Sequence, residues 1–118
     1  MKDCTIYKTV DLVGKRWALC VLLELYKGDK KEKRFNELKR CIIGITPKTL
    51  STRLKELEHA GLVERKIDSS VVPVRSEYWL TESGEDFINI IHDIKKWGLK
   101  WKFENKVCEL SLCKQCRM

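Results

Sequence analysis

The stretch GITPKTLSTRLKELEHAGLVERK, residues 44–66, contains a helix whose start can be located from the sequence alone. Thr46 is a typical N-cap residue, because its hydroxyl can accept a hydrogen bond from an N–H of the first turn. Pro47 then occupies the first helical position, where its missing N–H is not needed. Ile45, just before the cap, can pack on Leu50 as a hydrophobic staple. Together these residues predict that a helix begins at residue 47.

The side chains of this predicted helix separate into an apolar face and a polar face. The apolar stripe repeats at i, i+4 and i+7 and consists of Leu50, Leu54 and Leu57. Gly61 is a typical C-terminal stop for the helix. The face opposite the leucines carries Lys48, Thr52, Lys55 and His59. It is flanked by Thr49, Ser51 and Glu56. Arg53 lies at the edge of the apolar stripe, so the outward surface is dominated by side chains that donate hydrogen bonds.

The surrounding elements indicate the fold class. Apolar periodicity predicts three earlier helices, at residues 4–13, 16–26 and 35–42. The second of these is so apolar that we expect it to be buried on nearly all sides. After Gly61 the pattern changes to two strands, at residues 62–67 and 74–80, with a turn at 68–70. Helix, short helix, capped helix and hairpin is the order of a winged helix-turn-helix, an α+β fold that is mainly α.

The last predicted helix begins after the N-cap Thr81 and has an unusually wide apolar stripe. The residues of the stripe are Phe87, Ile88, Ile90, Ile91, Ile94, Trp97, Gly98 and Trp101. A terminal helix that packs only on its own small domain does not need so wide a stripe. We therefore expect a second subunit to cover it.

The predicted fold suggests duplex DNA as the partner. In a winged helix-turn-helix the second helix of the motif enters the major groove, and the hairpin, or wing, touches the DNA beside it. The net charge of +7 suits a polyanionic partner. We predict major-groove contacts from Lys48, Thr49, Ser51, Thr52 and Lys55. For the wing the cationic candidates are Arg65, Lys66 and Arg75. Arg34 is expected to meet a phosphate near the preceding helix, and Arg53 either turns toward a phosphate or braces the motif.

The length of 118 residues indicates one domain. We divide the chain into a DNA-binding and dimerisation domain at 1–103 and a cysteine-containing C-terminal tail at 104–118. No run is long and apolar enough to cross a bilayer, and the charged N-terminus does not resemble a signal peptide. We therefore expect a cytoplasmic protein with no membrane partner, whose six cysteines do not form a static disulfide framework.

Four stretches of the chain carry a family resemblance. They are GKRW at 14–17, RFNEL at 34–38, residues 44–65, and EYWLTESG at 77–84. In this order they resemble the HxlR family of winged helix-turn-helix transcriptional regulators, which is related to the MarR group. The resemblance implies a homodimer built from the N- and C-terminal helices, binding to an operator, and control of transcription.

The resemblance also bears on the cysteines. Cys4 occupies the place of an N-terminal cysteine that senses oxidants or electrophiles in some family members, although Thr5 follows it where proline is typical. Cys4 is therefore either a redox-sensing residue or an inert interface thiol. We interpret Cys20 and Cys41 as small buried hydrophobic residues. The tail has a C-x4-C-x2-C array formed by Cys108, Cys113 and Cys116.

Three interpretations of the tail cysteines remain open. They can hold zinc or iron, with a fourth ligand from Cys4, His92 or a partner chain. Alternatively Cys113 and Cys116 form a reversible disulfide, or all three are simply reduced thiols.

Two other functions fit parts of the sequence. One is a metal- or redox-responsive protein that uses the C-terminal cysteines. The other is a winged-helix module that binds proteins and not DNA. An enzyme is not supported, because the only histidines are His59 and His92 and no Gly-rich phosphate loop, G-x-S-x-G or H-E-x-x-H motif occurs.

Overall fold

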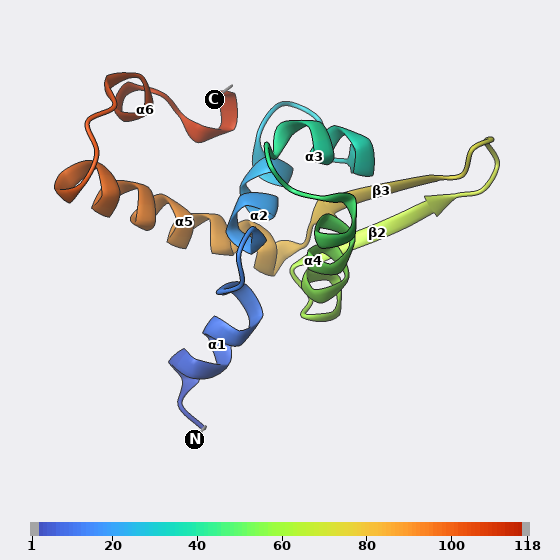
Figure 1. Ribbon diagram of the computed structural model, residues 1–118, viewed down its shortest axis with the longest axis horizontal. Helices are drawn as coiled ribbons and strands as arrows, with labels where there is room; N and C mark the ends of the chain where they lie inside the picture. The colour runs from blue at the N-terminus through green and yellow to red at the C-terminus, as the bar shows by residue number, and fades with distance from the viewer. Residues whose placement is uncertain (1–2, 117–118) are drawn as a thin grey trace.

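A computed structural model describes residues 3–116 as a mainly helical structure with one small sheet (Figure 1). The elements in chain order are α1 (Thr5–Val13), α2 (Ala18–Tyr26), β1 (Lys33–Arg34), α3 (Phe35–Cys41), α4 (Pro47–His59), β2 (Val63–Asp68), β3 (Arg75–Leu80), α5 (Glu82–Trp101), α6 (Lys106–Leu110) and the 3₁₀ turn η1 (Cys113–Gln115). The winged helix-turn-helix order predicted from the sequence is confirmed, with α3 and α4 as its two motif helices.

The sheet is antiparallel and has the strand order β1-β3-β2. Strands β2 and β3 form the wing, with Val63 opposite Leu80 at its base and Asp68 opposite Arg75 toward its tip. The wing extends away from the packed centre (Figure 1). The sequence did not predict β1, because two residues are too short to show a strand period.

The core is formed where α2, α3, α4, the sheet and the start of α5 meet. The leucine stripe of α4 is at most 1% exposed, as predicted for its packing face. It packs among the buried side chains Val21, Leu22, Leu38, Val63, Tyr78, Leu80 and Ile88. The common core fixes the position of α4 and thereby aims its opposite face outward.

The interpretation of Cys20 and Cys41 as buried residues is wrong, because both side chains are exposed. The core positions of α2 are taken by Ala18, Val21, Leu22 and Leu25. This arrangement leaves Cys20 on the outward side of the helix, so α2 is not buried all round. Cys41 ends α3, whose buried position is Leu38.

Helices α1 and α5 project from this centre (Figure 1), and both carry exposed apolar side chains. On α1 the exposed apolar residues are Ile6, Tyr7, Val10 and Leu12. On α5 they are Ile90, Ile94, Trp97 and Trp101. Within residues 3–116, no helix has the length and apolar content needed to cross a membrane. The chain after α5 turns back, so that η1 lies beside α2 (Figure 1).

Candidate nucleic-acid interface

Helix α4 begins and ends as its sequence predicts. The Thr46 hydroxyl accepts a hydrogen bond from the N–H of Thr49 at 3.1 Å, and Pro47 is the first helical residue. Ile45 and Leu50 on either side of the cap are both buried, as expected for a staple. Gly61 follows the last turn with φ +87°, a left-handed conformation that side-chain-bearing residues rarely adopt. Local chemistry therefore fixes both ends of the helix.

The face of α4 opposite the core is accessible. Its exposed residues are Lys48, Thr52, Lys55 and His59, and the half-buried residues Thr49 and Ser51 border it. The hydroxyl of Thr52 donates to the Lys48 carbonyl at 3.0 Å. Among residues 3–116, the ammonium groups of Lys48 and Lys55 make no hydrogen bond or ion pair. Both cations, with neighbouring hydroxyls, are thus available to a partner that offers hydrogen-bond acceptors.

Arg53 on the same helix is engaged internally. Its Nε donates to the Arg16 carbonyl at 2.9 Å, and its Nη1 lies 2.9 Å from Glu56 Oε1. Lys15 Nζ contacts the other oxygen of Glu56 at 2.7 Å. The hydrogen bond from Lys15 is the main reason that the pKa of Glu56 is lowered, and the contact with Arg53 adds to it. Of the two roles predicted for Arg53, the structure shows the brace.

The GKRW stretch supplies the other end of this brace. Trp17 has a left-handed backbone, with φ +81°, and the Arg16 guanidinium lies 4.7 Å from its ring. Gly44 precedes α4, and a Cβ atom there would lie 3.4 Å from Trp17 Cη2. Sequence reasoning missed that Lys15, Arg16 and Trp17 hold α4 in place. The only sequence indication was the compact GKRW stretch itself.

The cations of the wing alternate with acidic residues. Lys66 pairs in register with Glu77, and Arg75 pairs with Asp68. The pKa of Asp68 is lowered, first by hydrogen bonds from Ser70 and further by these two cations. Arg65 lies 3.9 Å from Glu58 on α4. The predicted wing residues are exposed, but their positive charge is partly offset by neighbouring carboxylates.

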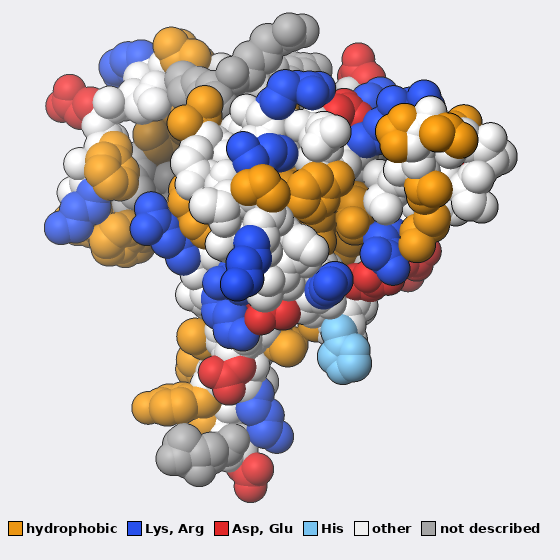
Figure 2. All heavy atoms as spheres, turned by 45° about the vertical axis from the view of Figure 1, so that its right-hand side comes forward, with side chains coloured by type: hydrophobic (Ala, Val, Ile, Leu, Met, Phe, Trp, Pro, Cys, Tyr) orange, Lys and Arg blue, Asp and Glu red, His pale blue; other side chains and the backbone are white. Residues whose placement is uncertain are grey.

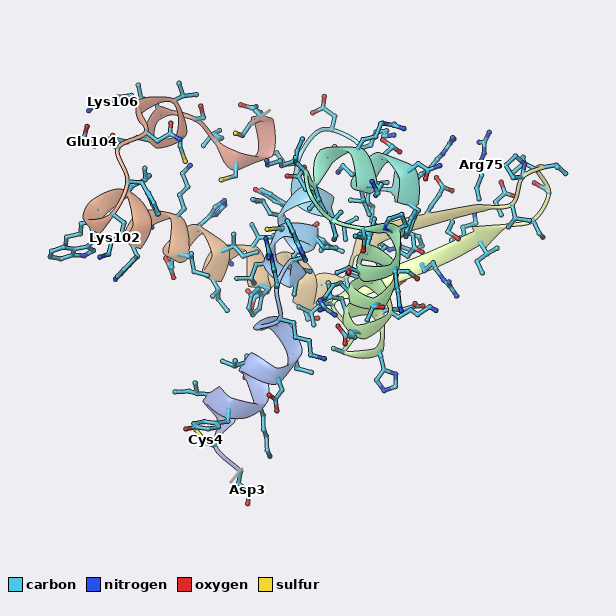
Figure 3. The ribbon with its side chains drawn as sticks, viewed as in Figure 1. Asp3, Cys4, Arg75, Lys102, Glu104 and Lys106 are labelled. Atoms are coloured by element: carbon cyan, nitrogen blue, oxygen red, sulfur yellow. The ribbon has the colours of Figure 1, made fainter. Side chains whose placement is uncertain are left out.

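A groove between α3 and the wing gathers three arginines. It has a volume of about 630 Å³ and is lined by Arg34, Arg40 and Arg75, among others. Arg75 stands off the wing on the side that faces α3 (Figure 3). The view that brings the wing forward shows Lys and Arg side chains spread over this side of the molecule (Figure 2). The sequence predicted Arg34 and Arg75 separately and missed Arg40, because only the fold brings α3 next to the wing.

Comparison with known protein families supports the winged helix-turn-helix arrangement. The sequence profile of HxlR-like helix-turn-helix proteins matches residues 12–106. The chain belongs to the HxlR-like helix-turn-helix family. It is a transcriptional regulator with a helix-turn-helix fold and not an enzyme, as the sequence predicted.

Regulators of Bacillus subtilis are among the relatives of this HxlR-like protein. The HTH-type transcriptional regulator YkvN is 41% identical over 96 residues, which is 81% of this chain and 78% of YkvN. YdzF, another such regulator, is 40% identical over 98 residues, which is 83% of this chain and 87% of YdzF.

Two solved structures of regulators are similar to this chain. The reduced form of the transcriptional regulator YodB from B. subtilis has a TM-score of 0.70 and 32% identity, covering 86% of this chain and 97% of YodB. The redox regulator HypR in its reduced form has a TM-score of 0.72 and 34% identity, covering 82% of this chain and 92% of HypR.

The cysteines of this HxlR-like chain are dispersed. Cys4 is exposed at the outer end of α1 (Figure 3), whereas Cys108, Cys113 and Cys116 are half-buried in the tail. Over residues 3–116, no group of three or more His, Cys, Asp or Glu side chains is arranged to hold a metal ion. The structure therefore does not gather the tail cysteines into the zinc or iron site suggested by their spacing.

Proposed function

We propose that this HxlR-like protein is a homodimer that binds a specific duplex DNA operator in the cytoplasm and thereby controls transcription. The observation that carries the proposal is the polar face of α4. Its lysines and hydroxyls are available to a partner, while the rest of the helix is held by the leucine stripe and by the Arg53 brace. A rigid helix with outward hydrogen-bond donors is what readout of base edges in the major groove requires.

In this proposal the residues of the interface divide into two groups. The residues that contact base edges are Lys48, Thr49, Ser51, Thr52 and Lys55. Phosphates are contacted by Arg34 and Arg75, which line the groove between α3 and the wing, and by Lys66 on β2 of the wing. Arg53 acts through its brace, because its guanidinium already has two partners within the chain.

A second copy of the chain is the proposed cover for the projecting helices. Ile6 on α1 is 71% exposed, and Trp97 on α5 is 57% exposed. Large apolar side chains left exposed on two projecting helices are uncommon on a monomer and typical of an obligate interface. A symmetric dimer buries both helices and places its two α4 helices to read two half-sites.

Selection of bound sequences from a random duplex pool tests the proposal. We expect enrichment of a two-fold related sequence whose half-sites lie one helical turn, about 10–10.5 base pairs, or a multiple of it apart. Analytical ultracentrifugation of the protein alone should give the mass of a dimer. A pool that shows no enrichment at low salt would contradict DNA recognition, and enrichment of a single half-site by a monomer would contradict the dimer.

A second candidate function adds thiol sensing at Cys4 to this regulator. The exposed position of Cys4 at the tip of the proposed dimer helix favours it, as does the similarity to the redox regulator HypR. If Cys4 is the sensor, peroxide treatment changes operator affinity in the wild type and not in Cys4→Ser. Metal analysis of the purified protein separately tests whether zinc or iron is bound at the tail.

A further inference from the structure

The C-terminal tail is attached to the body of the protein by polar contacts. The N–H of Gly28 donates to the Lys114 carbonyl at 2.7 Å, and Lys114 Nζ donates to the Tyr26 carbonyl at 2.9 Å. The same ammonium lies 4.7 Å from the centre of the Tyr26 ring. On the other side, Lys95 Nζ from α5 donates to the Ser111 carbonyl at 3.0 Å. We call residues 111–116 the tail latch, since they bind the end of α2 and the middle of α5.

The latch contains two cysteines in a geometry that suits a disulfide. The N–H of Cys116 donates to the Cys113 carbonyl at 3.2 Å, which closes the 3₁₀ turn η1. In such a turn residues i and i+3 lie on the same side, about 6 Å apart along the axis. A disulfide needs Cα atoms roughly 4.4–6.8 Å apart. The backbone of the turn therefore suits a disulfide, and closing the bond requires the side chains to rotate and the turn to adjust slightly.

The sulfur of Cys113 has a cationic neighbour. Lys95 Nζ donates to Cys113 Sγ at 3.6 Å, in addition to its bond to Ser111. The thiolate is the reactive form of cysteine, and an adjacent ammonium stabilises its negative charge. We therefore assign Cys113, whose sulfur accepts this bond, as the attacking thiol and Cys116 as the resolving thiol.

We propose that Cys113 and Cys116 are a redox-active dithiol that a hydroperoxide converts into an intrachain disulfide, loosening the tail latch. The Cys113 thiolate attacks the outer peroxide oxygen, so that an S–O bond forms, the O–O bond breaks, and an alcohol or water leaves with a proton. The Cys116 thiolate then attacks Cys113 Sγ, so that the S–S bond forms and hydroxide leaves, taking up the proton released by Cys116 to become water. In total, two thiols and one hydroperoxide give one disulfide, one alcohol or water, and one further water.

Formation of the disulfide changes how the latch is held. Cys113 Sγ must rotate away from Lys95 to reach Cys116, so the sulfur contact with α5 is lost. The N–H of Gly28 donates to the carbonyl of Lys114, a residue of this turn, so we expect this bond to weaken as the turn adjusts to the disulfide. This inference does not depend on DNA binding, because it concerns only the contacts between the tail and the body.

Peptide mapping of the oxidised full-length protein tests the inference directly. Trypsin cuts after Lys106, Lys114 and Arg117, so Cys113 and Cys116 fall on separate peptides, 107–114 and 115–117. After one equivalent of hydrogen peroxide and alkylation, we expect these two peptides to be joined through Cys113. Cys108→Ser is the matched control and should still give the linked pair, whereas Cys113→Ser should not.

Two further measurements distinguish a specific reaction of Cys113 and Cys116 from non-specific oxidation of cysteines. Lys95→Met removes the ammonium while keeping an extended side chain. It should slow formation of the disulfide between the two peptides roughly fivefold, because one partly exposed charge contact is lost. Hydrogen exchange at Gly28 should become faster in the oxidised wild type and stay unchanged in oxidised Cys116→Ser. Cys41 and Cys116 line one pocket between α3 and the tail latch. Linkage of Cys116 to Cys41 would overturn the inference. An unchanged rate in Lys95→Met or unchanged Gly28 exchange would also overturn it.

Discussion

Replacing Arg53 with alanine should destabilise the fold and not merely weaken a contact with DNA. The substitution removes the bond from Nε to the Arg16 carbonyl and the contact with Glu56, both at 2.9 Å. The Arg53 side chain is only 19% exposed, so little water replaces its partners. A charge-assisted bond contributes about 1.5–3 kcal/mol, whereas the pair with the more accessible Glu56 adds less. We expect a loss of about 2 kcal/mol, or about 6–10 °C in Tm for a domain of this size.

Lys55→Ala is the matched comparison, because Lys55 lies on the same helix but is exposed and has no partner among the described residues. Its free energy of unfolding should stay within about 0.5 kcal/mol of the wild type. Its preference for the selected operator over a scrambled duplex should fall by about 1–3 kcal/mol. Both variants are measured by thermal unfolding at one protein concentration and by fluorescence anisotropy at several salt concentrations.

The brace and a phosphate contact predict different outcomes for Arg53→Ala. The brace predicts a lower Tm for Arg53→Ala. For the protein that remains folded, the dependence of the logarithm of the DNA-binding constant on the logarithm of the salt concentration should be unchanged. A phosphate contact predicts an unchanged Tm and a salt slope smaller by about one. The second result would refute the bracing role.

Three further predictions follow from other contacts. Leu54→Ala should lower the free energy of unfolding by about 2–5 kcal/mol in chemical denaturation, because Leu54 is 1% exposed in the core, and an effect under 1 kcal/mol would contradict this packing. The hydrogen bond from Lys15 is the main reason that the pKa of Glu56 in the folded state is below its usual value of 4.5. The ionised Glu56 carboxylate therefore stabilises the fold fully above pH 4.5, and this stabilisation is lost as the pH falls through the lowered folded-state pKa. Glu56→Gln should therefore lower the Tm at pH 7 and have little effect near pH 3, and an equal effect at both would exclude the ionised carboxylate as the cause. Trp97→Lys should dissociate the proposed dimer in ultracentrifugation while leaving the helical circular dichroism unchanged, and a stable dimer would place the interface elsewhere.

Much of the candidate interface could be predicted from the sequence, because its determinants are local. The cap at Thr46, the leucine stripe and the stop at Gly61 depend on residues three or four positions apart, so the polar face of α4 followed from helix geometry. The same holds for the cap at Thr81, whose hydroxyl accepts from the Gly84 N–H at 3.2 Å. The interpretation of Cys20 and Cys41 failed because composition does not say which side of a short helix meets the core.

The sequence by itself determined the helices α1 to α5, the two strands of the wing and which face of α4 is polar, since hydrogen-bonded turns and apolar periods are set by near neighbours. Only the tertiary structure decided the contacts between distant segments. It joined Arg53 to Arg16, 37 positions away, and Lys114 to Tyr26, 88 positions away. Such pairs form because packing of the core brings their backbones together, and no local pattern records which donor will meet which carbonyl.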